Sequence, residues 1–229
     1  MKKLTISMAS YEKILGWVYY AIQILILPQL IVSALSVFGI VPSDSELNLL
    51  YFLSNFIAMV AIFHQFLLES FRIAKAKIGR CFGTAGLGFL IYWGMSITVM
   101  AVILYISPDY ANLNNENIGA MQEEHQILIS LAAVLLVPVA EELVFRGLIF
   151  RSLFNYSNIL AYTVSTLAFS LVHVIGYMGQ MDLTHALLSI LQYLPAGIAL
   201  GWTYQKTDTI WTPVLMHTFI NLIGIFAVG

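Results

Sequence analysis

Residues 126–150 read QILISLAAVLLVPVAEELVFRGLIF, an apolar stretch in which three ionisable residues stand close together. A transmembrane helix needs about 20 consecutive, mainly apolar residues, so this stretch predicts a helix that crosses a membrane. Its second half contains Glu141, Glu142 and Arg146. An ionisable group near the middle of a bilayer costs at least about 2.5–3.5 kcal/mol. Three such groups in one span therefore require an explanation.

The composition of the whole chain agrees with a membrane protein. Of its 229 residues, 60% are apolar and 10% are charged, and the mean hydropathy is +0.87. Soluble domains have about 25% charged and about 45–50% apolar residues, so a water-soluble protein is excluded. The net charge of −2 offers no basic surface for nucleic acid, and the single Cys81 excludes an internal disulfide. We expect one integral-membrane domain over residues 1–229.

Apolar runs recur along the chain, and each is continuous rather than alternating, which favours helices over barrel strands. The sequence therefore predicts an all-α, polytopic transmembrane bundle of about seven helices. The first run is longer than the roughly 7–15 apolar residues of a cleavable signal peptide, so we expect it to be retained. The runs cover residues 14–38, 49–71, 82–106, 126–150, 159–178, 184–205 and 209–228.

Basic residues lie almost entirely on one side of these predicted spans. The loops on the other side carry aspartate and glutamate but neither lysine nor arginine. The positive-inside rule then places the N-terminus in the cytoplasm and the C-terminus outside a cell membrane that the chain crosses several times. Apart from Arg146, the basic residues are Lys2, Lys3, Lys13, Arg72, Lys75, Lys77, Arg80, Arg151 and Lys206.

Polar motifs are confined to the second half of the chain. Residues 1–106 carry none, whereas residues 126–225 form the predicted catalytic core. Between them, residues 107–125 are acidic and rich in asparagine. This segment predicts an external loop that is mobile or folds as an interfacial helix.

Spacing separates the roles of the two neighbouring acids. Glu142 and Arg146 are four residues apart, so they share a helical face and can pair. Glu141 points about 100° away from Glu142 and is less well placed for that partner. Burial opposes ionisation of Glu141 while nearby cations favour it, which suits a carboxyl group that transfers protons. The alternative is that all three residues form only an ionic clamp between helices.

Two later runs add further polar groups. His173 lies in the run 159–178, and His217 and Asn221 lie four residues apart in the last run, on one helical face. A lone buried histidine usually only forms a hydrogen bond between helices. Together with the three residues of the fourth run, however, these groups indicate a site.

The three motifs resemble those of the CAAX protease and bacteriocin-processing family, also called the Abi family of intramembrane proteases. The resemblance covers about residues 126–225. It implies that Glu141 is the catalytic carboxylate, that His173 helps it to activate water, and that Glu142 and Arg146 orient Glu141. His217 and Asn221 would form the oxyanion site. The motifs read Glu141-Glu142-x-x-x-Arg146, Phe169-x-x-x-His173 and His217-x-x-x-Asn221.

Whether such an enzyme uses a metal is left open by the resemblance. Glu141, His173 and His217 have the donor atoms of a catalytic zinc site with one open position. The His-Glu-x-x-His motif of many zinc proteases is absent from the sequence. We expect glutamate catalysis without a cofactor, with zinc as the alternative.

The resemblance implies a glutamic or metallo-type endopeptidase that cuts a membrane-associated peptide or a membrane-anchored protein. Relatives trim prenylated tails or are linked to bacteriocin maturation and immunity, and the sequence does not identify the substrate. The alternative function is a non-proteolytic immunity or scaffold protein that binds a bacteriocin or a membrane partner. A transporter is disfavoured because the helices show no repeated interruption in the two halves.

Overall fold

A computed structural model describes residues 4–228, of which residues 4–225 have described side chains. Helices make up its regular structure, and residues 4–228 contain no strand. The prediction of an all-α bundle is confirmed. In chain order, the elements are α1 (Ser10–Leu25), α2 (Leu27–Ser36), α3 (Asp44–Ile62), α4 (His64–Ala76), α5 (Ile78–Ile106), α6 (Leu113–Leu131), η1 (Ala132–Leu136), α7 (Val137–Glu142), η2 (Leu143–Phe150), α8 (Arg151–Phe154), α9 (Asn158–Ile175), α10 (Leu183–Thr207) and α11 (Trp211–Val228).

The helices are long and apolar enough for a polytopic membrane protein. Five candidate spans are present among the described residues, or six if the bent pair α1–α2 counts as one. Helix α11 corresponds to the seventh predicted run, although its searched apolar part, Trp211–Ile225, is shorter than a full span. The expected count of about seven is therefore roughly consistent with the structure, and every predicted run contains a helix.

Two of the predicted runs are broken rather than straight. The run 14–38 bends by 64° between α1 and α2, where Pro28 lies in the first turn of α2 and cannot donate a backbone hydrogen bond. The run 49–71 is divided at Phe63, which separates α3 from α4. Phe66, in the first turn of α4, donates its backbone N–H to Glu12 Oε1 at 2.9 Å. Glu12 thus satisfies a free donor at the start of α4, which the apolar pattern alone did not predict.

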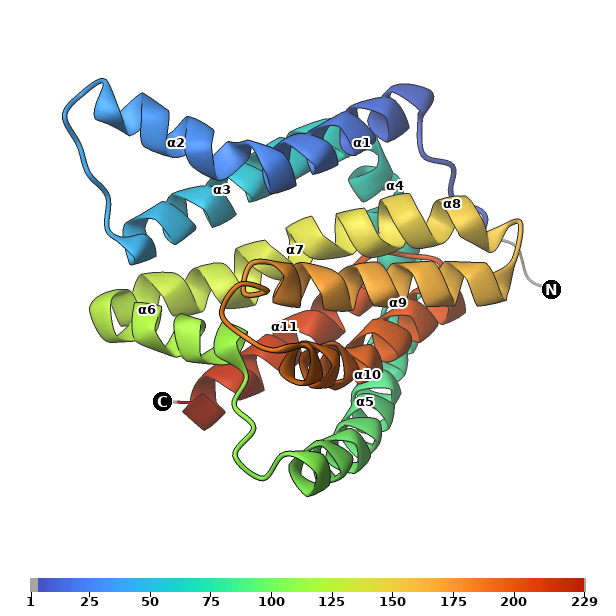
Figure 1. The fold of residues 1–229 in the computed structure, drawn as a ribbon. Coiled ribbons are helices and arrows are strands. Elements are labelled where there is room, and N and C mark those ends of the chain that lie inside the picture. Colours follow the sequence, from blue (N-terminus) through green and yellow to red (C-terminus); the bar gives the residue numbers. More distant parts are fainter. Residues whose placement is uncertain (1–3, 229) are drawn as a thin grey trace.

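The segment 107–125 is mostly helical. Helix α6 begins at Leu113, and its backbone leaves helical geometry at His125, where the chain reverses direction (Figure 1). Gln122 Nε2 donates to Ser130 Oγ at 2.8 Å across this reversal. Of the two forms that the sequence left open for this segment, the helical one is present from Leu113.

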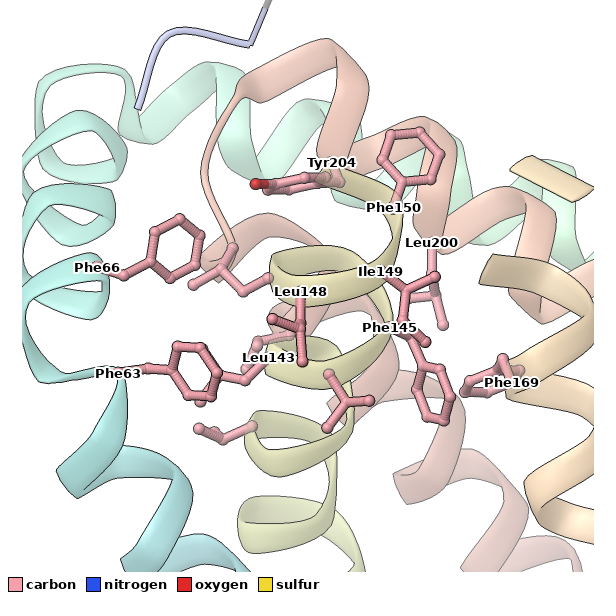
Figure 2. Packing of buried hydrophobic residues seen from close by; sticks show 14 of the residues in the cluster. Phe63, Phe66, Leu143, Phe145, Leu148, Ile149, Phe150, Phe169, Leu200 and Tyr204 are labelled. Atoms are coloured by element: carbon pink, nitrogen blue, oxygen red, sulfur yellow. The ribbon is translucent and has the colours of Figure 1, made fainter. Parts of the chain in front are cut away.

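A central rod formed by η1, α7, η2 and α8 organises the bundle. Helices α1 to α3 lie on one side of it, and α9, α10, α11 and α5 lie on the other (Figure 1). All eight residues of η2 are buried. Figure 2 shows Leu143, Leu148 and Phe150 of this element packed among aromatic side chains of the surrounding helices. A helix buried on every side is expected at the centre of a helical protein.

An extended N-terminal segment also enters this core. Leu4, Ile6 and Met8 are buried in alternation with exposed neighbours. The backbone N–H of Thr5 donates to Asp208 Oδ2 at 2.6 Å. Asp208 ends α10 in the left-handed conformation, with φ of 54°. The segment 4–9 is therefore fastened to an element almost the whole chain away.

Candidate active site

The rod that carries Glu141 and Glu142 has two wide, π-helical turns, η1 and η2, on either side of α7. In η1, the N–H of Val137 donates to the carbonyl of Ala132, five residues earlier. Turns of this type are rare, and they occur often at functional sites. The two acids therefore lie on a short α-helical piece between two irregular ones.

Pro138 leaves one backbone carbonyl of η1 without a backbone N–H donor. In the five-residue pattern the partner of the Ala133 carbonyl is residue 138, and proline has no N–H. Asn221 of α11 supplies the missing donor, with Nδ2 at 2.8 Å from the Ala133 oxygen. Thr218 similarly donates to the Val134 carbonyl at 3.1 Å. These bonds attach α11 to the rod beside the two acids.

Glu142 and Arg146 form a fully buried ion pair. Arg146 Nη1 lies 2.9 Å from Glu142 Oε1, and both side chains are fully buried. Arg146 Nη2 donates to the carbonyl of Gly197 at 3.1 Å. A side chain at Gly197 would collide with Thr166, because its Cβ would lie 2.7 Å from Thr166 Cγ2. Glycine therefore lets α10 approach α9 closely enough to complete the surroundings of Arg146.

Glu142 also orients His217. His217 Nδ1 lies 2.9 Å from Glu142 Oε1, which fits an Nδ1–H that donates to the carboxylate. The other ring nitrogen, Nε2, lies 3.8 Å from Glu141 Oε2. His217 thus lies between the two acids, with Nδ1 on Glu142 and Nε2 toward Glu141.

His173 approaches Glu141 from a different helix. Its Nδ1 lies 2.7 Å from the carbonyl of Phe169, and because a carbonyl only accepts, Nδ1 carries the proton. In the neutral imidazole, Nε2 then has a free lone pair, and it lies 3.8 Å from Glu141 Oε2. Glu141 Oε2 itself has no hydrogen-bond partner among the described residues. One carboxylate oxygen and two imidazole nitrogens therefore face the same small volume.

These groups line a cavity of about 270 Å³. Glu141, His173, His217 and Asn221 contribute to its wall, whereas Glu142 and Arg146 do not and lie behind it. The structure thus brings all six predicted residues into one cluster. It also adds polar lining residues that sequence reasoning missed, although the asparagine-rich segment 107–125 was a signal for some of them: Asn114, Asn115, Gln122, Gln192 and Tyr193.

The spacing of the donors does not fit a formed zinc site. Two ligands of a tetrahedral zinc with bonds of about 2.0–2.1 Å lie about 3.4 Å apart, whereas each histidine Nε2 is 3.8 Å from Glu141 Oε2. The described part of the chain contains no group of three histidine, cysteine, aspartate or glutamate residues arranged to hold a metal ion.

The arrangement provides the groups that peptide-bond hydrolysis requires. A carboxylate can take a proton from water and later return it to the leaving amine. An imidazole lone pair can accept a hydrogen bond from the same water, and N–H groups in a site with little water can stabilise an oxyanion. All of these functional groups border the cavity at Glu141.

Comparison with known proteins also indicates a peptidase. Residues 123–223 match the family model described as Rce1-like, type II CAAX prenyl endopeptidase Rce1-like. All six predicted site residues lie in the matched range.

Two curated proteins are similar to part of the chain. The first is the "Putative membrane peptidase YdiL" of Bacillus subtilis strain 168, 30% identical over 95 residues, which are 41% of this chain and 34% of that protein. The second is the UPF0177 protein YxdF of Lactococcus lactis subsp. lactis strain IL1403, 31% identical over 90 residues, or 39% of this chain and 44% of that protein. The match thus spans less than half the length of either relative.

No solved structure matches the chain significantly. The family match therefore rests on sequence, and it includes Glu141, His173, His217 and Asn221 of the cavity wall. Over residues 123–223, the resemblance to the CAAX proteases that the three motifs indicated is confirmed, in the form of the Rce1-like family of type II CAAX prenyl endopeptidases.

Proposed function

We propose that this protein is an intramembrane endopeptidase that hydrolyses peptide bonds of membrane-associated peptides or proteins. The observation that carries the proposal is the convergence of Glu141 Oε2 with Nε2 of His173 and Nε2 of His217 at one cavity, each at 3.8 Å. The match to a family of endopeptidases over the same residues supports it. The relatives' names do not fix the substrate.

Glu141 and His173 would activate the attacking water. A water bound between them donates one hydrogen bond to Glu141 Oε2 and one to the lone pair of His173 Nε2. Glu141 takes a proton as the water oxygen bonds to the substrate carbonyl carbon. When the carbon–nitrogen bond breaks, the same proton passes from Glu141 to the departing amine. One water is consumed, and the carboxylate is restored.

His217 and Asn221 would stabilise the tetrahedral oxyanion. In its doubly protonated form, His217 donates from Nδ1 to Glu142 and from Nε2 to the oxyanion. Asn221 Nδ2 has two hydrogens, of which one is used by the Ala133 carbonyl, so the second remains for the substrate. Loss of one such donor costs about 10²–10³ in rate in other oxyanion sites.

Replacement of Glu141 by glutamine tests the proposal. Glu141→Gln keeps the size of the side chain but removes the base, so proteolysis should fall by orders of magnitude while the folded protein persists. Peptidomics of membranes from cells that produce either form should then reveal a substrate that stays uncut only with the variant. Glu69→Gln is the matched control, because Glu69 is exposed on α4, outside the cavity.

The opposite result has a clear meaning. If Glu141→Gln leaves cellular function and the peptide profile unchanged, the proteolytic assignment is wrong. The immunity or scaffold function then becomes the better explanation, because binding of a partner does not require a base at residue 141.

A further inference from the structure

The imidazole of His173 lies between two aromatic rings. The ring of Tyr193 is stacked on it, with centroids 4.4 Å apart and an interplanar angle of 26°. The ring of Phe169 is tilted against it at 4.7 Å and 51°. The hydrogen bond from Nδ1 to the Phe169 carbonyl restrains rotation of the ring about its Cβ–Cγ bond. The two aromatic contacts restrain the same rotation, and together these contacts hold Nε2 in place.

Tyr193 is itself held by the start of α6. Its hydroxyl donates to Asn112 Oδ1 at 3.2 Å and accepts from Asn114 Nδ2 at 3.2 Å. Asn112 also caps α6, because its Oδ1 accepts the backbone N–H of Asn115 at 3.0 Å. The orientation of the Tyr193 ring is thus tied to the first turn of a helix.

A second set of bonds fixes Asn112 to the helix that carries Tyr193. Asn112 Nδ2 donates to Gln192 Oε1 at 2.6 Å, and the same oxygen accepts from the Tyr110 hydroxyl at 2.7 Å. Gln192 and Tyr193 both line the cavity that contains Glu141. Asn112 therefore links two neighbouring residues of α10, because it bonds both to Gln192 and to the hydroxyl of Tyr193.

We infer that Tyr193 is a positioning residue, which holds the His173 imidazole with Nε2 toward Glu141, and that Asn112 and Asn114 hold Tyr193 in that place. This inference rests on the proposed function for its consequence in catalysis. Tyr193 acts through His173, because its ring is stacked on the imidazole of that catalytic residue. A misplacement of a catalytic group by about 1 Å can cost about 10²-fold in rate, so a free His173 ring should lower kcat more than it changes KM.

Two substitutions separate the ring of Tyr193 from its hydroxyl. Tyr193→Leu removes the stack, and Tyr193→Phe keeps the ring but removes both bonds to the asparagines. Tyr162 offers matched controls, because its hydroxyl makes a comparable bond between α9 and α10, to Gln205 Oε1 at 2.6 Å, and it does not line the cavity. Tyr162→Leu and Tyr162→Phe should therefore disturb packing without moving His173.

The first measurement needs no substrate. The protein has five histidines, so ¹⁵N-histidine NMR of the full chain in lipid nanodiscs, with His173→Gln to assign the signal, reports the tautomer and ring environment of His173. We expect a single Nδ1–H form in the unmodified protein and in both Tyr162 variants. Tyr193→Leu should lose the ring-current shift and broaden or average the tautomer signal. Unchanged His173 signals in Tyr193→Leu would overturn the inference.

The second measurement is the cleavage rate of the peptide that accumulates uncut with Glu141→Gln. Tyr193→Leu should lower kcat by about 10- to 100-fold with little change in KM, and Tyr193→Phe should fall between it and the unmodified protein. A raised KM with unchanged kcat would instead make Tyr193 a substrate contact and reject the positioning role. Should Glu141→Gln cleave normally, the proposed function fails, whereas the NMR result still decides whether Tyr193 orients His173.

Discussion

Glu141 and Glu142 are adjacent in sequence but have very different surroundings. Glu142 is fully buried and bonds to Arg146 and His217 through Oε1, whereas Glu141 borders the cavity, with its Oε2 3.8 Å from Nε2 of both His173 and His217. A buried acid with a cationic partner is held in place, while an acid without one is available for chemistry. This difference supports the proposal that Glu142 orients the site and that Glu141 reacts.

Arg146→Ala should reduce stability as well as activity. Removing one member of a buried ion pair costs about 3–5 kcal/mol, because the remaining charge stays buried without a partner. The loss should appear as a lower midpoint of thermal unfolding of the purified protein and as a lower protein level in cells. Arg72→Ala is the control, since Arg72 is exposed on α4. An Arg146→Ala protein as stable as the unmodified one would contradict a structural role for this pair.

Metal dependence is decided at the same residues. If Glu141 and His173 activate water without a metal, a strong chelator should leave the cleavage rate nearly unchanged. His217→Ala should then be slower by about 10²–10³ but still active, as expected after loss of one oxyanion donor. Stoichiometric zinc in active purified protein, with activity lost on its removal and restored on its return, would instead assign the three residues as ligands.

At the scale of single residues, the charged members of the candidate site could be predicted from the sequence, whereas the neutral residues that contact them could not. The cost of charge in a membrane singles out Glu141, Glu142 and Arg146 from one span. Tyr193 and Asn112 carry no comparable cost and lie in different parts of the chain, so no spacing rule connects them. Their contact with the site arises only when α10 packs beside the segment before α6.

The central rod shows how one proline shapes an element. Pro138 removes the donor that the Ala133 carbonyl would use, and Asn221 replaces it from α11. The continuous apolar run predicted a helix over 126–150. It could not reveal the two wide turns, because they change the backbone hydrogen bonds without interrupting the apolar sequence. The same holds for the break at Phe63, which depends on a hydrogen bond from Phe66 to the distant Glu12.

A double-mutant cycle can measure the link between Pro138 and Asn221. Asn221→Ala leaves the buried Ala133 carbonyl unpaired, which should lower the free energy of unfolding by about 1–3 kcal/mol. In a Pro138→Ala background, residue 138 regains an N–H that can serve this carbonyl, so Asn221→Ala should cost less. Denaturant titration of the four proteins gives the coupling. Equal costs in both backgrounds would show that the asparagine does not replace the proline's missing donor.

Cleavage by the same four proteins separates structure from chemistry. Pro138→Ala should restore stability to Asn221→Ala but not its activity, because the proposed oxyanion donor is still missing. If stability and activity recover together, Asn221 has only a structural role.

For the whole molecule, the arrangement of helices agrees with the apolar runs, while the direction of insertion rests on charge alone. Helix α5 joins two segments of opposite charge. The basic segment between the second and third runs lies at its start, and the acidic segment 107–125 follows its end. A helix of 29 residues is about 43 Å long at about 1.5 Å per residue, enough to reach both surfaces of a bilayer. The two segments are therefore expected on opposite sides.

Cysteine labelling of intact cells tests the orientation. In a Cys81→Ala background, a membrane-impermeant reagent should modify Asp109→Cys but not Lys77→Cys, because basic loops stay in the cytoplasm. Both positions are exposed in the bundle, so a difference in labelling reports the side of the membrane. Labelling of both after permeabilisation is the control. The reverse pattern in intact cells would reject a cytoplasmic N-terminus.

The segment 4–9 has a consequence for the timing of biosynthesis. Thr5 bonds to Asp208, 203 residues later in the chain. At a synthesis rate of about 5–20 residues per second, Thr5 is made roughly 10–40 seconds before its partner. The bond that fastens this segment cannot form during that interval, while the helices between are made. The N-terminal segment is therefore fastened late, only after the helices between Thr5 and Asp208 have been made.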